Sequence, residues 1–129
     1  MLVIDASSLI DACLADDGWA IFAGEQLIVP PLAISEPTSV IHEAQWRGEF
    51  TPESARQAVQ RIAEAPVTVQ ALNSPLLAWA VADELGWAKT YDAEYVALAR
   101  SLGCRLVTVD ARLRRGASRL IDIVGPAEL

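Results

Sequence analysis

Short segments that are apolar at every position constrain the fold of this 129-residue chain most strongly. Leu2–Ile4 and Leu27–Val29 are the clearest examples, and residues 106–109 form a similar run. A strand that is apolar on both faces is typical of a parallel sheet covered by helices on both sides. Two further strands are predicted over residues 67–72 and 120–124, so the sheet has about five strands.

Helical patterns separate these strands. Proline follows a capping residue at Thr51 and at Ser74, which is typical of helix starts. The predicted helices cover residues 7–14, the segment from Pro31 to about Arg47, the segment after Pro52, residues 75–86, residues 92–102 and a short basic stretch after Asp110. Val40, Ile41 and Ala44 are expected to face inward. The alternation predicts an α/β fold in one domain over residues 1–129.

Composition narrows the class of protein. Hydrophobic residues make up 53% of the chain and charged residues 21%, which excludes a disordered protein. No apolar run approaches the roughly 18 residues of a membrane span. The strand at Leu2 leaves no room for an export signal, so we expect a cytoplasmic protein. Cys13 and Cys104 lack metal-ligand spacing and are expected to be small buried residues.

Four acidic residues fall where the strands end. Asp5 and Asp110 each end an apolar strand, Glu36 follows the second strand, and Asp92 starts the helix that leads to the fourth. In parallel sheets, ligands bind outside the carboxyl ends of the strands, so these carboxylates converge if the first and fourth strands are neighbours. Such a cluster suits Mg²⁺ or Mn²⁺. Helix capping remains an alternative for Asp110 and for Asp92, where Thr90 competes.

The charge distribution bears on the substrate. The net charge is −7, whereas proteins that bind RNA are usually basic. Divalent cations bound to the acids, together with a local basic patch, would make the charge positive where the RNA binds. We therefore expect Arg112, Arg114 and Arg115 to contact RNA phosphates, with a solvated helix face as the alternative. The single histidine, His42, excludes a two-histidine ribonuclease and is expected on a helix surface.

Three segments resemble the PIN-domain family. They are Val3–Ser7, which is similar to the family's opening motif, Tyr91–Ala99, which resembles its third-acid helix, and Leu106–Leu113, which resembles its fourth-acid strand and turn. Length and order match VapC-like toxins across nearly the whole chain. The resemblance implies a three-layer α/β/α sandwich and a dimeric, Mg²⁺- or Mn²⁺-dependent endoribonuclease that cuts structured RNA such as transfer or ribosomal RNA. It also implies a VapB-like antitoxin.

By motif position, the resemblance assigns the catalytic and metal-binding roles to four acids and supporting hydrogen bonds to two hydroxyls. The acids are Asp5, Glu36, Asp92 and Asp110, and the hydroxyls are those of Ser7 and Thr108. One departure is Pro37, because proline is unfavourable inside a helix, where the family carries its second acid. The helix is therefore kinked or begins near Pro37. Glu43 is the alternative second acid.

Other classes fail on specific residues. A response-regulator receiver needs an aspartate after its third strand, where this chain has Leu72-Asn73-Ser74, and a dehalogenase-like phosphatase needs an acid at the position of Ser7. A PIN-like scaffold that binds RNA or protein without cutting remains as the alternative function. The mean hydropathy of +0.29 and the four tryptophans predict an apolar patch covered by a second subunit and by an antitoxin, with Trp19 and Trp46 as the exposed pair.

Overall fold

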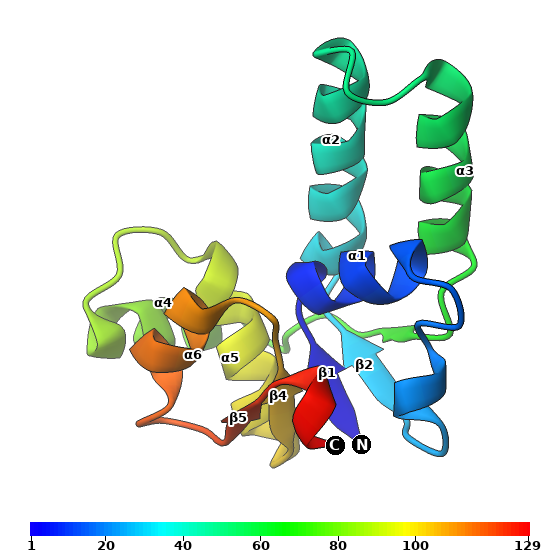
Figure 1. Cartoon of the computed structure of the whole chain (residues 1–129). Coiled ribbons are helices and arrows are strands. Elements are labelled where there is room, and N and C mark those ends of the chain that lie inside the picture. The colour runs from blue at the N-terminus through cyan, green and yellow to red at the C-terminus, as the bar shows by residue number, and fades with distance from the viewer.

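The computed structural model describes all residues, 1–129, and contains a five-stranded, fully parallel sheet (Figure 1). The strand order is β3-β2-β1-β4-β5. The strands are β1 (Leu2–Ile4), β2 (Leu27–Val29), β3 (Thr68–Val69), β4 (Arg105–Val107) and β5 (Ile123–Val124). The central strand β1 is buried at every position, which explains its continuous apolar sequence.

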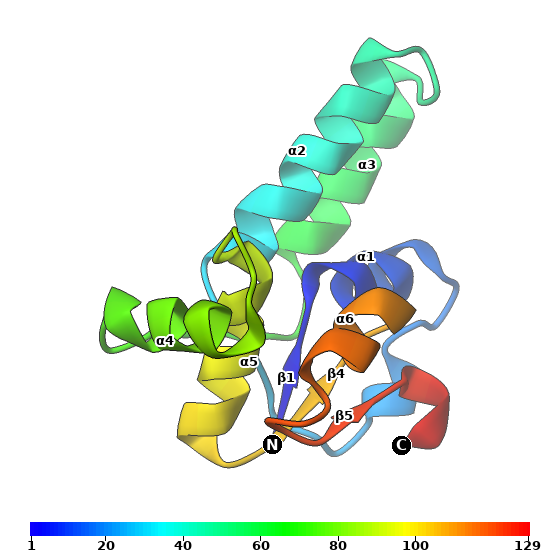
Figure 2. The same ribbon diagram turned by 90° about the vertical axis from the view of Figure 1, so that its left-hand side faces the viewer.

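Six α-helices and two short 3-10 helices surround the sheet. They are α1 (Ala6–Leu14), η1 (Ala20–Phe22), α2 (Leu32–Trp46), α3 (Pro52–Ala63), α4 (Pro75–Leu85), α5 (Tyr91–Leu102), α6 (Ala111–Ala117) and η2 (Pro126–Glu128). Helices α4 and α5 lie on one side, with α5 packed on β1 and β4, and α1 lies on the other (Figure 2), while α6 packs against β5. The predicted three-layer α/β/α arrangement is confirmed.

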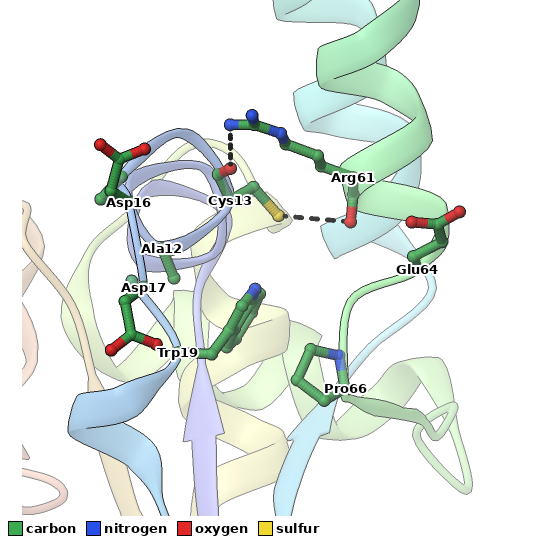
Figure 3. A pocket seen from close by; sticks show the side chains of 10 residues that line it. Ala12, Cys13, Asp16, Asp17, Trp19, Arg61, Glu64 and Pro66 are labelled. Atoms are coloured by element: carbon green, nitrogen blue, oxygen red, sulfur yellow. Dashed lines mark hydrogen bonds between the residues drawn. The ribbon is translucent and has the colours of Figure 1, made fainter.

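Helices α2 and α3 form a paired arm that extends away from the sheet (Figure 2). Two reciprocal bonds fasten its base to α1. Arg61 Nη1 donates to the Cys13 carbonyl at 3.2 Å, and Cys13 Sγ donates to the Arg61 carbonyl at 3.6 Å (Figure 3). Cys13 and Arg61 also line a depression beside Trp19, where their two bonds join α1 to α3. Cys13 is buried as expected, whereas Cys104 is only partly buried.

The predictions for the edge strands β3 and β5 were too long, and the prediction for the inner strand β4 ran past its end. Only Thr68–Val69 pairs within the predicted segment 67–72, and both residues are exposed. The last strand is Ile123–Val124 rather than 120–124, and β4 ends at Val107, leaving Val109 48% exposed. An edge strand has one neighbour, so its pairing length depends on that neighbour rather than on its own apolar run.

Helix α2 begins at Leu32 and continues through Pro37, so of the two alternatives, a kink or a start near Pro37, the start was wrong. Proline lacks the backbone amide that would donate a helical hydrogen bond, and burial of the apolar Pro37 ring offsets this cost. Val40, expected to face inward, is 46% exposed, while Ile41 and Ala44 are buried. Helix ends were predicted well where glycine closes them. Gly86 and Gly103 follow α4 and α5 with φ of 72° and 64°.

The predicted pair of exposed tryptophans was half right. Trp46, at the end of α2, is 86% exposed, but Trp19 packs on the core, with its ring 5.9 Å from that of Phe22. Trp79 on α4 is 67% exposed instead, next to the exposed Leu76. None of the helices combines the length and the apolar character that crossing a membrane requires.

Candidate active site

The carboxyl ends of β1 and β4 form the floor of the site. These strands are parallel neighbours, and Ile4 pairs in register with Val107. The residue after each strand therefore lies beside the other, which brings Asp5 next to Thr108. The adjacency of the first and fourth strands, on which convergence of the acids depended, is thus present in the fold.

Asp5 is only 4% exposed and is surrounded by donors. Its Oδ1 accepts the Ser8 amide at 2.9 Å, and its Oδ2 accepts the Thr108 hydroxyl at 2.5 Å. The Ser7 hydroxyl lies 2.8 and 2.9 Å from the two oxygens. The bond from Ser8 makes Asp5 the N-cap of α1, a signal that the sequence Asp-Ala-Ser-Ser carries.

These donors leave Asp5 with little free capacity. A carboxylate offers about four lone-pair sites, and three protons from Ser7, Ser8 and Thr108 occupy three of them. One site remains for a cation. Burial raises the pKa of Asp5 despite the hydrogen bonds from Thr108, Ser8 and Ser7, which lower it. The protein around Asp5 therefore disfavours an uncompensated negative charge.

Asp110 is joined to Asp5 through one side chain. The Asp110 amide donates to Thr108 Oγ1 at 3.0 Å, and that hydroxyl donates to Asp5. Asp110 Oδ1 accepts the amides of Arg112 and Leu113, so this residue caps α6 as the capping alternative predicted. Both of these bonds go to Oδ1, and its Oδ2 accepts none.

Asp92 and Glu36 lie at the mouth of the site. Asp92 is exposed, is the second residue of α5 and caps nothing, so the capping alternative was wrong for this residue. The surrounding protein raises the pKa of its carboxyl group, the Asp110 carboxylate raises it further, and Arg112 lowers it. Partial burial raises the pKa of Glu36, and the charges of Asp92, Asp5 and Glu94 add to the rise.

The structure separates the two alternatives for the acid on α2. Glu36 is half-buried and feels the charges of Asp92 and Asp5. Glu43 is exposed, and its carboxylate lies 4.0 Å from Arg47, one turn later on the same helix. Of the two residues, only Glu36 interacts with the other acids.

These pKa shifts predict how the metal-free protein responds to pH. A carboxyl group whose pKa is raised by folding stabilises the fold when protonated, and this stability is lost as pH rises through the folded-state pKa. We expect the free energy of unfolding to increase as pH falls from neutral toward 4.5, the ordinary pKa of glutamate. Glu36→Gln should reduce this increase. Urea unfolding across that range measures it, and an identical pH dependence in both proteins would contradict the repulsion described above.

Two nearby groups were not identified from the sequence. Glu94 lies two residues after Asp92 and raises the pKa of Glu36. Tyr95, one turn after Asp92, is 1% exposed, and its hydroxyl is buried without a hydrogen-bond partner. Burial and the charges of Glu36 and Asp5 raise the pKa of Tyr95, so the hydroxyl keeps its proton. The i,i+3 spacing from Asp92 was the available signal for Tyr95, whereas the i,i+2 spacing of Glu94 gave none.

The three arginines of the predicted RNA contact lie on α6 in different surroundings. Arg112 is exposed beside Asp92. Arg114 pairs with Glu128 of η2, with Nη2 2.9 Å from Oε2. Arg115 is exposed and forms no ion pair. Arg112 is therefore the one whose charge acts directly on the acids.

Comparisons with known proteins identify the family of the chain. A family model described as PIN domain matches residues 2–118. VapC ribonuclease Mb0985 of Mycobacterium bovis is 38% identical over 118 residues, which covers 88% of each chain. Ribonuclease VapC3 of Mycobacterium tuberculosis is 32% identical over 120 residues, 88% of this chain and 85% of that protein.

Solved structures show the same fold. PAE2754 from Pyrobaculum aerophilum superimposes with a TM-score of 0.80 at 25% identity, over 98% of this chain and 84% of that one. VapBC2 from Rickettsia felis, solved with a DNA fragment from their promoter, gives 0.67 over 96% and 97% of the chains. Its 10% identity shows likeness of fold alone. From the family match and its identity to these relatives, the chain belongs to the PIN-domain family as a VapC-type member.

Proposed function

We propose that the chain is a metal-dependent endoribonuclease, the toxin of a type II toxin–antitoxin module, that hydrolyses phosphodiester bonds in structured RNA such as transfer or ribosomal RNA. The observation that carries this proposal is the continuous path from Asp110 through Thr108 to Asp5 across β4 and β1, with Asp92 and Glu36 above it. The identity to proteins named VapC ribonuclease supports the same activity.

The donor set fits Mg²⁺ or Mn²⁺. Every candidate ligand is a carboxylate oxygen, the donor that these hard cations prefer. Burial raises the pKa of Asp5, Glu36 and Asp92, and repulsion from neighbouring carboxylates adds to the rise for Glu36 and Asp92; a bound cation would offset both effects. The unpartnered Tyr95 hydroxyl adds a proton donor beside these acids.

Asp5, Glu36, Asp92 and Asp110 would hold the ion. No three acidic, histidine or cysteine side chains are gathered tightly enough to share one ion in the structure. Binding of the ion therefore requires that some of these side chains move. Asp92 and Glu36 are less buried than Asp5 and have more freedom to do so. When bound, the divalent ion supplies Lewis-acid activation of water and neutralises charge on the scissile phosphate.

The chain's own residues set the geometry. Ser7 and Thr108 fix the orientation of the Asp5 carboxylate through hydroxyl hydrogen bonds. The first amides of α6 hold Oδ1 of Asp110 and leave Oδ2 free to face a ligand. Arg112 supplies positive charge beside Asp92, where a phosphate would otherwise be repelled.

Partners follow from the exposed apolar side chains. Trp79 and Leu76 on α4 and Trp46 at the tip of the arm are exposed by 67%, 70% and 86%. We propose that a second copy of the chain and a VapB-like antitoxin cover these residues in the cytoplasm. Sedimentation of the purified chain tests the dimer, and a monomer at high concentration would contradict it.

Incubation of total RNA with the chain and Mn²⁺ or Mg²⁺, with and without chelator, tests the activity. We expect discrete cleavage products that disappear with the chelator. A chain that leaves RNA intact although it binds Mn²⁺ and folds normally would favour the alternative, a PIN-like scaffold that binds RNA or protein without cutting. Products that persist in excess chelator would contradict metal dependence.

A further inference from the structure

An open depression of about 600 Å³ adjoins the acids, a volume typical of small-molecule sites. Glu36 and Asp92 form one part of its lining. Residues 86–89, which follow α4, and Tyr91 at the start of α5 form a second part, and Arg112 and Leu113 of α6 form the rest. In the proposed function the acids hold the ion that meets the reacting phosphate, so the remaining surface lies where the adjoining nucleotide would rest.

Two aromatic side chains line this depression in different ways. Trp87 is half-buried against α6, where a Cβ on Gly116 would lie 3.1 Å from the indole ring, so the fold holds its position. Tyr91 is 57% exposed at the first position of α5, and its ring takes no part in the core. An exposed ring at the mouth of a polar site offers a stacking surface for a planar ligand.

Two cations stand on the same surface. Lys89 is the only lysine of the chain, and neither Lys89 nor Arg112 forms an ion pair within it. Arg114, by contrast, is paired with Glu128. In a chain of net charge −7, two unpaired cations beside an acidic cluster provide a local attraction for phosphate groups.

We propose that residues 86–91 and Arg112 form a subsite for one unpaired nucleotide of the RNA, with its base stacked on Tyr91 and its flanking phosphates on Lys89 and Arg112. The base must be unpaired because a base inside a duplex has both faces covered, whereas single-stranded RNA is held by stacking and by cations along its backbone. This inference rests on the proposed function and adds the form of substrate that the site accepts.

The single lysine allows a direct test. Reductive methylation with ¹³C-formaldehyde labels only Lys89 and the amino terminus and keeps the positive charge of the lysine. The amino terminus pairs with Glu25 beyond the start of β1, at the opposite end of the strand from Asp5, and serves as the internal control. The probe is a short oligouridylate, added with Mg²⁺ to the Asp110→Asn variant, in which asparagine preserves the cap of α6.

We expect the Lys89 methyl signal to shift saturably with the oligouridylate, while the terminal signal stays in place. A duplex of equal length should shift it less. Tyr91→Ala should weaken binding roughly tenfold, whereas Tyr91→Phe should bind as the parent does. Ile21→Ala, which removes an exposed apolar side chain outside the depression, should change nothing. Lys89→Gln should reduce the slope of log K against log salt by about 0.7.

Equal shifts of both signals, equal binding of duplex, or unchanged affinity in Tyr91→Ala would overturn the subsite. These outcomes are separate from failure of the proposed function. A chain that cuts RNA yet fails this test loses the subsite alone. Oligouridylate bound at Lys89 in a chain whose wild type cuts no RNA preserves the subsite and removes the ribonuclease.

Discussion

Asp92→Asn is expected to lower the rate of RNA cleavage by roughly 100-fold or more, the effect of removing one charge that acts on the reacting centre. The same change should alter the free energy of unfolding by no more than about 0.5 kcal/mol. Asp92 is exposed and caps nothing. The favourable position of its charge near the start of α5 is offset by partial burial and by repulsion from Asp110, which both raise the pKa of Asp92.

The cleavage rate at saturating Mg²⁺ and a urea unfolding curve measure the two effects on the same preparation. Asp83→Asn is the matched control, because Asp83 is an exposed aspartate on α4 outside the site. Asp83→Asn should keep wild-type cleavage and stability. Full cleavage by Asp92→Asn would remove this residue from the machinery, and a large loss of stability would show that it has a structural role instead.

Asp5→Ala should lose about 2–4 kcal/mol of stability, the largest structural effect in the site. The change removes the N-cap of α1 and leaves the buried Ser8 amide and Thr108 hydroxyl without their acceptor. Part of this loss in stability is offset, because burial of the Asp5 carboxylate, which raises its pKa, is itself unfavourable. Asp5→Asn should be milder, because its amide oxygen still accepts the Ser8 amide.

Urea unfolding of the two Asp5 variants and the wild type measures this difference. Wild-type stability in Asp5→Ala would contradict the hydrogen bonds assigned to the carboxylate. Loss of cleavage in an Asp5 variant would therefore have two possible causes, a missing metal ligand and a less stable fold. Substitution of Asp92, which caps no helix, tests the role of the acids in cleavage without this second cause.

The sequence was sufficient for the centre of the fold and insufficient for its edges. Apolar β1 and β2 are covered on both faces, so their own residues determine where they run. Strand β3 is exposed at both positions, and its extent is determined by pairing with β2, which no local pattern reveals. Pro37 inside α2 shows the same limit, because burial of the ring against other elements outweighs its local cost.

The site shows a similar division. The positions of Asp5 and Asp110 after two strands were sufficient to predict that both lie at one end of the sheet. Their connection through Thr108 depends on the register of β1 and β4, and the buried Tyr95 hydroxyl depends on how α5 packs. Trp19 and Trp79 could not be distinguished in advance, because exposure of a tryptophan is decided by neighbours distant in sequence.

The central claim is that the four carboxylates act together on one kind of cation, and calorimetric titration of Mn²⁺ tests it most directly. Wild type and Asp83→Asn should bind Mn²⁺ alike near neutral pH, and Asp92→Asn and Glu36→Gln should each bind it at least roughly 10-fold more weakly. Equal Mn²⁺ affinity in all four proteins, or no binding by the folded wild type, would contradict the account.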